Sequence, residues 1–455
     1  MNQSISFKFY KILDNDGNVD PVVDEIRAGT SLSKKNIFLS TSVSEILNNV
    51  GREGDRAVIE LANKFDNSNL SGSRDLFVTK REIKRAYREL KPKEILAIRR
   101  SRNQIRFLAR RQMERFAKKT YNTPLGYKIE ESFKPIERVG GYIPGGLASY
   151  PSTVLMISVT AKEAGVEDII ICTPAKNGRV NPSVLVAADI CGVEEILKVG
   201  GVQGIGALAF GTQTVRKVSL ITGPGNQYVT EAKKQIMRSG ICSIDMLAGP
   251  TELLILADSS ANPRLVYEDL ISQAEHGNKT LCGVVSDSAD LLDQVKQLAS
   301  NRSERSRKKF KEISESTLFG VKANSIEKDG LAFVNKFAPE HLQVIVSKLL
   351  ERRVESKLTN AGLLLFGEYA PCSASDYIVG TNHILPTGGE AAKGAGLDVG
   401  KFLKRVTIVR ATKTALRKSI RDLSILAELE NLPNHANAAG ARFEVVDSTQ
   451  SIERR

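Results

Sequence analysis

The chain has 455 residues, of which 26% are charged and 41% hydrophobic, with a formal net charge of +13 at pH 7, and this length suggests about two to four domains. No apolar run reaches the roughly 18–20 residues that span a bilayer, the N-terminus lacks the pattern of a secretory signal, and the five cysteines include no C-x-x-C pair. We therefore expect a cytoplasmic protein without a membrane span, a disulfide framework or a cysteine zinc site.

The segment before about residue 125 is predicted to be largely helical. Residues 1 to about 35 form a polar leader for which we expect little structure. Ser42-Val-Ser-Glu45 matches a capping box, which predicts a helix from there to about Lys64. A basic stretch follows, and Pro92 is a predicted break within it.

Nearly all of the excess positive charge lies in residues 80–119, where 16 Lys and Arg stand against four Glu, a local balance of +12. The stretch has helical spacing, with apolar residues on one side at Ile95, Ile98, Ile105 and Leu108. It lacks a zinc finger, an RNA-binding aromatic pair and a helix-turn-helix pattern. We interpret it as a solvated helix and expect no nucleic-acid partner, although the charge would attract anionic substrates or cofactors.

From about residue 125, short β-branched runs alternate with helical stretches. The clearest predicted strands are Asp168–Cys172, Leu253–Ala257, Leu281–Ser286 and Leu363–Phe366. Helices are predicted at Ser152–Ala164, Pro182–Ile190 and Val229–Met237. Uninterrupted apolar strands between helices are typical of parallel sheets, so we predict an α/β fold with blocks at about 125–250 and 251–385. The tail from about 398 is expected to be mostly helical and polar.

Only four histidines occur, and each has neighbours that suit a metal or acid–base site. Their settings are Gln273-Ala-Glu-His276, Glu340-His341, His383 seven residues after Asp376, and His435 five residues after Glu430. Any single one could equally be an ordinary core or surface histidine.

Gln273 and His276 are three residues apart in a predicted helix (Leu265 to His276), so both would lie on one face. An amide oxygen and an imidazole nitrogen form an acceptable half of a zinc or manganese site, which Asp376 and His435 could extend. The spacing also arises by chance.

Glu340 and His341 follow Pro339, which pushes Ala338 toward an extended conformation. In a loop, both side chains could point into a cleft, with His341 as a general base and Glu340 activating water. An exposed helix start is the simpler alternative.

Three glycine segments carry weaker signals. Gly140–Gly146 predicts a rigid turn, and Gly223-Pro-Gly-Asn226 precedes a predicted helix whose N-terminus could hold a phosphate. Gly204-Ile-Gly206 is the nearest variant of a dinucleotide fingerprint and is too weak to assign one. All three are also explained by ordinary loop turns.

Taken together, these segments closely resemble the histidinol dehydrogenase family over roughly residues 35–445. The matching motifs are Arg138-Val-Gly-Gly-Tyr-Ile-Pro-Gly-Gly146, Pro151-Ser-Thr-Val-Leu-Met156, Val199-Gly-Gly-Val-Gln203, Ala207-Leu-Ala-Phe-Gly211, Ile221-Thr-Gly-Pro-Gly-Asn226, Ile244-Asp-Met-Leu-Ala-Gly-Pro250, Ser272-Gln-Ala-Glu-His-Gly277, Ala338-Pro-Glu-His-Leu342 and Gly380-Thr-Asn-His-Ile-Leu-Pro-Thr387.

The resemblance implies two incomplete Rossmann-like parallel-sheet domains, small and mostly helical terminal segments, and an intertwined homodimer. Residues 35–141 with 252–397 would form the first domain, which carries the metal and catalytic residues. Residues 142–251 would form the second domain, which contacts NAD. The tails, 1–34 and 398–455, would take part in dimerisation.

It also implies a reaction, the oxidation of L-histidinol by NAD in two steps, through L-histidinal, to L-histidine, the end of histidine biosynthesis. One zinc ion per subunit would hold the substrate's imidazole and amine, bound by Gln273, His276, Asp376 and His435. His341 would be the base of the first oxidation, and Glu340 would activate the water of the second.

The remaining implied contacts are to substrate and cofactor. The substrate-binding positions are Thr251, Gln273, His276, His341, Asp376, His383, Glu430 and His435, with Glu430 suited to the ammonium. The NAD-contacting positions are Tyr142, Gln203 and Asn226. Because the tails of the dimer complete each site, His435 would come from the other subunit.

The chain departs from the family at two places before Asp376. The family usually reads Pro-Glu-x-x-Gly-Asp there, whereas this chain has Cys372 and Ser375 in place of the glutamate and glycine. Metal affinity or loop geometry could differ as a result.

Two other functions are open. A related enzyme could oxidise another amino alcohol, although the retained Glu430, His383 and His435 speak against it. A nucleic-acid-binding or scaffold protein with an inactive site would be expected to have lost Glu340, His341 or a metal ligand, and none is substituted.

Overall fold

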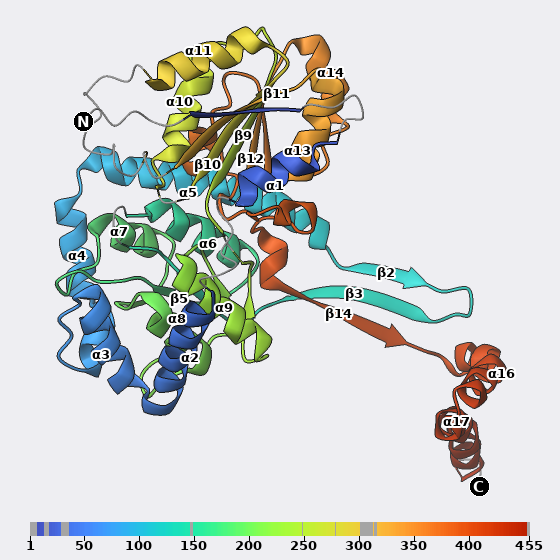
Figure 1. Cartoon of the computed structure of the whole chain (residues 1–455). Coiled ribbons are helices and arrows are strands. Elements are labelled where there is room, and N and C mark those ends of the chain that lie inside the picture. The colour runs from blue at the N-terminus through green and yellow to red at the C-terminus, as the bar shows by residue number, and fades with distance from the viewer. Residues whose placement is uncertain are drawn as a thin grey trace. The chain divides into compact units, whose positions relative to one another are not determined.

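The computed structural model describes residues 7–12, 18–28, 36–145, 149–247, 249–277, 279–300, 313 and 316–452. The chain divides into two compact units, each of which is described by itself (Figure 1). The body comprises Met1–Gln112 and Ile136–Phe402, and the arm comprises Met113–Pro135 and Leu403–Arg455. In the described part of the chain, no helix is both long and apolar enough to cross a membrane.

The first domain of the body is built on a six-stranded, all-parallel sheet. From edge to edge its strands are β1 (Phe7–Lys11), β11 (Thr317–Lys322), β10 (Leu281–Ser286), β9 (Glu252–Ala257), β12 (His341–Ile345) and β13 (Leu363–Phe366). The helices that cover it are α1 (Asp20–Ala28), α10 (Pro263–Ala274), α11 (Ala289–Ser300), α13 (Leu331–Phe337) and α14 (Lys348–Glu355).

The strands of this sheet are apolar throughout because both faces are covered. Side chains alternate between the faces: Leu253 and Ile255 pack with α10 and α11, whereas Leu254 and Leu256 pack with α1, α13 and α14. The strands predicted at residues 253–257, 281–286 and 363–366 are confirmed.

The second domain of the body is built on a five-stranded, all-parallel sheet. In order across the sheet, its strands are β6 (Glu195–Leu197), β5 (Asp168–Cys172), β4 (Arg138–Tyr142), β7 (Leu220–Thr222) and β8 (Ser243–Ile244). Its helices are α2 (Asn36–Glu53), α3 (Asp55–Asp66), α6 (Pro151–Glu163), α7 (Pro182–Ile190), α8 (Gly201–Phe210) and α9 (Gln227–Arg238).

The order of these five strands places the switch of direction between β4 and β7. From β4 the chain winds outward through β5 and β6, and then returns to β7 on the other side of β4. Ligands of doubly wound folds bind at the carboxyl ends of the strands at such a switch point. The α/β prediction and the strand predicted at residues 168–172 are confirmed.

Helix α2, which covers the first helix predicted from the sequence, differs from that prediction. It starts at Asn36, so Ser42 of the proposed capping box lies inside the helix and is not its N-cap. It also ends at Glu53, because Gly54 has a φ of 59° and starts α3 as its N-cap. A capping box does occur at Thr79 and Glu82, where it starts α4 (Lys80–Glu89).

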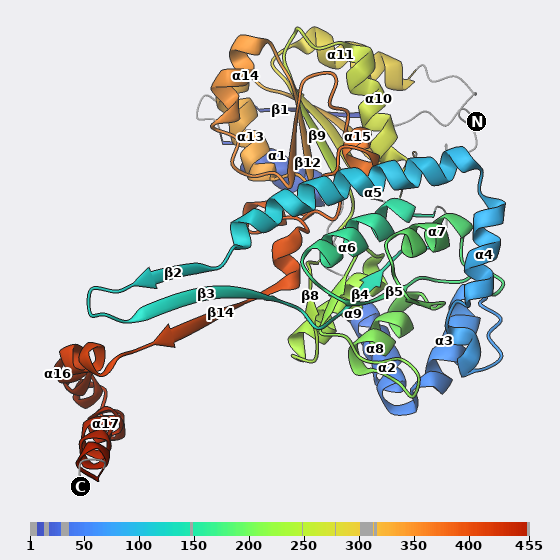
Figure 2. The same cartoon turned by 180° about the vertical axis from the view of Figure 1, so that it is seen from behind.

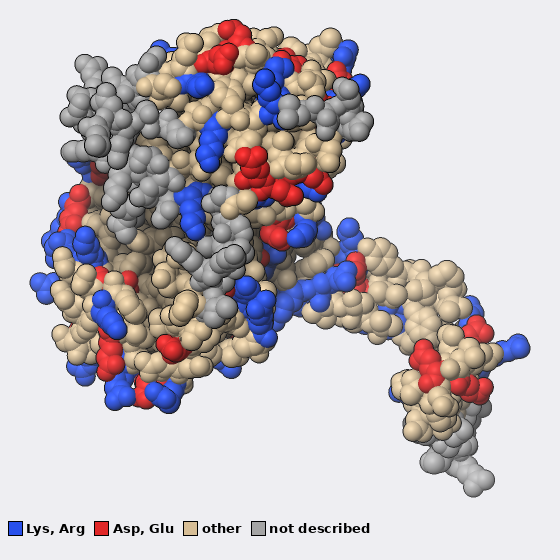
Figure 3. All heavy atoms as spheres, viewed as in Figure 1, with Lys and Arg blue, Asp and Glu red and all other residues tan. Residues whose placement is uncertain are grey.

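The basic stretch forms α4 and α5 (Pro92–Met113), with the predicted break at Pro92. Part of its charge is paired, since Glu89 accepts from Arg85 and Glu163 accepts from both Arg106 and Arg110. Lys and Arg on the face shown in Figure 3 are interspersed with Asp and Glu. Figure 2 shows α5 between the elements of the two sheets, where Ser101 donates to the Tyr377 carbonyl.

Three expected boundaries change. The N-terminal leader contributes β1, which pairs with β11 along its whole length. Residues 35–141 were assigned to the first domain, but α2 and α3 pack in the core of the five-stranded sheet. The division at residue 141 would also cut β4, the central strand of that sheet. The domain to which an element belongs is decided by the sheet whose apolar face it covers, and its position in the chain does not reveal that sheet.

The arm contains a three-stranded antiparallel sheet and two helices. The strands are β14 (Leu403–Arg410), β3 (Lys128–Pro135) and β2 (Lys119–Asn122), and the helices are α16 (Lys413–Leu429) and α17 (Pro433–Ile452). The predicted helical tail from 398 to 455 therefore begins with η6 (Val399–Phe402) of the body and a strand.

Candidate functional site

The candidate site lies at the amino ends of the strands in the six-stranded sheet. His341 is the first residue of β12, beside Leu253 of β9. Since Leu342 and Val344 face α13, alternation turns His341 toward the face that α10 covers. The Glu252 amide donates to Glu340 Oε2 over 2.9 Å and fixes that carboxyl beside the imidazole.

Glu340 and His341 are only 6% and 2% exposed, so the alternative of an exposed helix start is wrong. The expected extended conformation of Ala338 is also wrong, since its φ of 46° is left-handed. Ala338 ends α13, and its amide donates to the Val334 carbonyl. This reversal leads the chain from α13 directly into β12.

Helix α10 brings Gln273 into the site. Asn262 caps its start, and the helix ends at Ala274, so Gln273 is buried in the last turn. His276 was expected on the same helix face but lies in the turn beyond, where it is exposed. A helix C-terminus favours nearby cations because its carbonyl dipoles point outward.

The short helix α15 (Cys372–Tyr377) brings Cys372 and Asp376 to Gln273. The Gln273 Nε2 atom is 3.1 Å from the Cys372 sulfur and 3.2 Å from Asp376 Oδ2. His383 Nδ1 lies 3.9 Å from Asp376 Oδ1. On its other side, His383 Nε2 hydrogen-bonds with Thr153 of α6 at 2.9 Å, so both domains of the body contribute.

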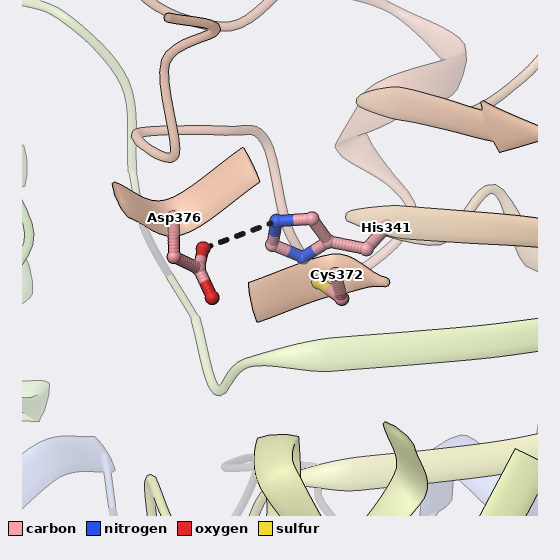
Figure 4. Close-up of side chains that lie close together, drawn as sticks. All are labelled: His341, Cys372 and Asp376. Carbon is pink, nitrogen blue, oxygen red and sulfur yellow. Dashed lines mark ion pairs between the residues drawn. The ribbon is translucent and has the colours of Figure 1, made fainter. Parts of the chain in front are cut away.

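Several polar atoms of this cluster are buried and, among the described residues, have no hydrogen-bond partner. They are Gln273 Oε1 and both ring nitrogens of His341. Figure 4 shows the imidazole of His341 turned toward Asp376, at 4.0 Å from Nε2 to Oδ1, with Cys372 beside it. Buried polar atoms without partners are costly, so the cluster is suited to a ligand that would satisfy them.

The electrostatics of the cluster also favour a cation. Burial lowers the pKa of His341 to about 3 and that of His383 to about 4, helped by repulsion between the imidazoles. Burial raises the pKa of Asp376 to about 6, and burial together with Glu252 and Asp376 raises the pKa of Glu340 well above its usual value. The imidazoles are thus neutral and able to donate a lone pair, and a cation would relieve the crowded carboxyls.

Within the body, some of the residues expected to bind zinc lie close together. Gln273 and Asp376 are in contact, and His276 follows one turn beyond Gln273. His341, Cys372 and Asp376 offer atoms within 4.8 Å of one another. From the sequence we noted Cys372 only as a departure from the motif, because no spacing rule connects it to Gln273, 99 residues earlier.

Two of the three positions expected to contact NAD lie at the switch point of the five-stranded sheet, and the third, Gln203, lies in the first turn of α8 (Gly201–Phe210). Tyr142 ends β4, and Asn226 follows β7 and caps α9 through bonds to the amides of Tyr228 and Val229. Tyr142 and Gln203 are buried and bonded within the protein, to the Gly201 amide and the Asp66 carboxylate respectively.

The loop after β7 is supported by a buried ion pair that no sequence motif indicates. Lys233 is 2% exposed, forms an ion pair with Asp245 and donates to the Gly223 carbonyl over 2.9 Å. Asp245 accepts from the Gly223 amide over 2.8 Å. Gly223 has a φ of 121°, and a Cβ there would lie 2.1 Å from the Tyr142 carbonyl oxygen, so the loop requires glycine.

The remaining substrate positions are spread over the chain. Thr251 directly precedes β9 and is half-buried. Glu430 and His435 belong to the arm, at the end of α16 and the start of α17, and both are exposed. Their part in the site stays a prediction.

Comparisons with known proteins agree with the resemblance of the motifs. The family model described as histidinol dehydrogenase matches residues 31–443. The histidinol dehydrogenase of Methanocaldococcus jannaschii is 42% identical over 89% of this chain and 92% of its own, and that of Lactococcus lactis is 36% identical over 95% and 99%. The crystal structure of the histidinol dehydrogenase from Elizabethkingia anophelis has a TM-score of 0.88 and 33% identity, covering 98% of this chain and all of that one.

Proposed function

The chain belongs to the histidinol dehydrogenase family, a family of oxidoreductases, and we propose that it oxidises L-histidinol with NAD in two steps, through L-histidinal, to L-histidine. The observation that carries the proposal is the buried group of Glu340, His341, Gln273 and Asp376, which supplies a base, a second carboxyl and metal donors in one place. The cytoplasm is the proposed location.

Gln273, His276 and Asp376 would hold zinc, together with His435 of the partner subunit. When bound, the metal would supply a positive charge that holds the imidazole and amine of the substrate. A metal that binds the imidazole and amine of the substrate would leave its carbinol free to face His341. Because the aldehyde formed first is held in place, it would not be lost before the second oxidation.

His341 would take the hydroxyl proton in the first oxidation. Its low pKa keeps the ring neutral at pH 7, and neither ring nitrogen has a hydrogen-bond partner within the described residues. The imidazolium that forms would be stabilised by Glu340 Oε2, 3.8 Å from Nδ1, and by Asp376 Oδ1, 4.0 Å from Nε2. NAD would accept the hydride in each step.

Glu340 would take a proton from the water that attacks the aldehyde. Its Oε2 atom is held by the Glu252 amide, which fixes the carboxyl next to His341. A carboxylate whose pKa is raised by burial is a stronger base than one in water. Two groups with different pKa shifts therefore allow two separate proton transfers.

We assign substrate-binding roles to Thr251, His383 and Glu430, with the Glu430 carboxylate suited to the substrate's ammonium group. NAD would lie at the switch point, near Tyr142, Gln203 and Asn226. The loop from Gly223 fits this role because its glycines let the backbone approach a diphosphate at the start of α9.

A homodimer is part of the proposal. Helix α16 and the turn after it expose large apolar side chains in the isolated chain, with fractions of 47% at Ile425, 60% at Leu426, 79% at Leu429 and 40% at Leu432. An exposed apolar group of this kind is typical of a protein–protein interface. A second copy of the chain would cover it and bring Glu430 and His435 to a neighbouring site.

The test is the yield of NADH from purified protein with L-histidinol and NAD. We expect two NADH per histidinol, a loss of activity on chelation and its return with zinc. A metal-replete protein that makes no NADH would reject histidinol as the substrate and would direct the search to other amino alcohols.

A further inference from the structure

Cys372 lies among the residues proposed to bind the metal, at a position where the family motif usually has a glutamate. It is the first residue of α15 and is fully buried. Its sulfur is 3.1 Å from Gln273 Nε2, and it shares with His341 and Asp376 a group of donor atoms within 4.8 Å of one another (Figure 4).

A buried cysteine often serves only as a small apolar side chain. Here one side of Cys372 does pack into the core beneath α10. Its other side meets an amide and a carboxylate, which an apolar role leaves unexplained. The amide of Gln273 contacts this sulfur through Nε2, and within the described residues its Oε1 atom is buried without a hydrogen-bond partner, which points to a ligand that would satisfy it.

We propose that Cys372 is a thiolate ligand of the metal in this site, together with Gln273 and Asp376. This inference rests on the zinc site of the proposed function. All three donors come from the body, from the last turn of α10 and from α15. The thiol proton leaves to solvent when the metal binds, so the thiolate carries the negative charge of the missing glutamate.

The donor set would change which metals the site prefers. Thiolate is a soft donor that suits zinc, whereas sites of oxygen donors also suit manganese and magnesium. A sulfur donor would therefore select zinc more strongly than the usual family residue does. Removal of Cys372 is expected to weaken zinc binding by about tenfold or more, in a competition with a chelating dye.

Cobalt(II) reports the ligands directly, because a thiolate adds a sulfur-to-metal charge-transfer band in the near ultraviolet. We would remove the metal from the full-length protein, add one equivalent of cobalt and record the visible and near-ultraviolet spectra. Wild type is expected to show visible ligand-field bands and the charge-transfer band. Cys372→Ser and Cys372→Glu are expected to keep the visible bands and lose the charge-transfer band.

Cys191→Ser is the matched control, because Cys191 is a free, half-buried cysteine outside this cluster, and it should keep both sets of bands. Circular dichroism shows which variants fold, and if Cys372→Ser does not, Cys372→Glu carries the test.

Equal near-ultraviolet spectra in wild type and the Cys372 variants would overturn the thiolate ligand and leave the sulfur as a hydrogen-bond acceptor for Gln273. That result would leave the proposed zinc site intact. Absence of visible bands in wild type would reject the metal site and this ligand together, whereas the NADH yield tests the oxidation separately.

Discussion

At the scale of single residues, the site is defined by groups whose ionisation burial opposes. Glu340 lies near the Glu252 and Asp376 carboxyls, and its pKa is raised well above the usual value. An acid whose pKa is raised on folding costs stability in its ionised form, and this cost grows as the pH rises through that pKa. The position therefore carries a cost to stability that a catalytic role would explain.

Glu340→Gln is expected to separate the two proposed oxidations. The amide oxygen can still accept from the Glu252 amide, but it cannot take a proton from water. We expect oxidation of added L-histidinal to fall by about 10²–10⁴-fold, with a smaller effect on the first oxidation of L-histidinol. Single-turnover NADH formation from each substrate measures both steps.

The same substitution removes a carboxyl whose ionisation burial opposes, so the midpoint of thermal unfolding at pH 7 should stay the same or rise. Equal losses in both oxidations, accompanied by a lower unfolding midpoint, would indicate structural damage and remove Glu340 from the second step.

At the scale of elements, the loop between β7 and α9 depends on a charge pair below it. Lys233 and Asp245 are among the most buried charged residues of the body, with 2% and 4% exposure. Asp245 also accepts from the Thr222 hydroxyl over 3.0 Å and from the Met246 amide over 2.7 Å. The pair thus connects α9, β7 and the segment after β8.

Lys233→Met should loosen this loop, because Asp245 would keep a buried charge without its cation. We expect a loss of about 3–5 kcal/mol in the free energy of unfolding and a higher KM for NAD. The double variant Lys233→Met/Asp245→Asn removes both charges and should recover much of the stability. Chemical denaturation and steady-state kinetics measure the two effects, and an unchanged KM for NAD in a folded Lys233→Met would place the loop outside the cofactor site.

Helices and strands are predictable from the sequence where a single local pattern determines them. The apolar run at Asp168–Cys172 has the length and composition of a buried strand and forms one. The conformation of Ala338 was not predictable from Pro339, because the end of α13 and the start of β12 impose the turn. Likewise, His276 leaves the helix face because α10 ends two residues before it.

At the scale of the whole molecule, contacts distant in sequence decide what local patterns cannot. The sequence predicts a helical tail where the structure has strand β14. This strand pairs along its full length with β3, and the paired residues Leu403 and Pro135 are nearly 270 positions apart in the chain. The contact of Gln273 with Cys372 is of the same kind. Neither pair has a spacing from which it could have been inferred, whereas the motif resemblance identified the candidate site residues without placing them.

The proposed sharing of sites between subunits can be tested by mixing two inactive variants. His341→Asn removes the proposed base from the body, and His435→Ala removes a proposed metal donor from the arm. If each site joins one subunit's body to the partner's arm, neither homodimer has an intact site. A mixed dimer has one, made from the body of the His435→Ala chain and the arm of the His341→Asn chain.

Random exchange of equal amounts makes half of the dimers mixed, and each mixed dimer has one working site of two, so we expect about one quarter of wild-type activity. Leu429→Lys in both chains is the control, because a charge on this exposed apolar residue should prevent pairing and abolish the recovery. NADH formation after co-refolding measures the recovered activity, and the mass from light scattering shows whether the mixture is dimeric. No recovery in a mixture that is demonstrably dimeric would mean that each chain completes its own site, and His435 would then act on the body of its own subunit.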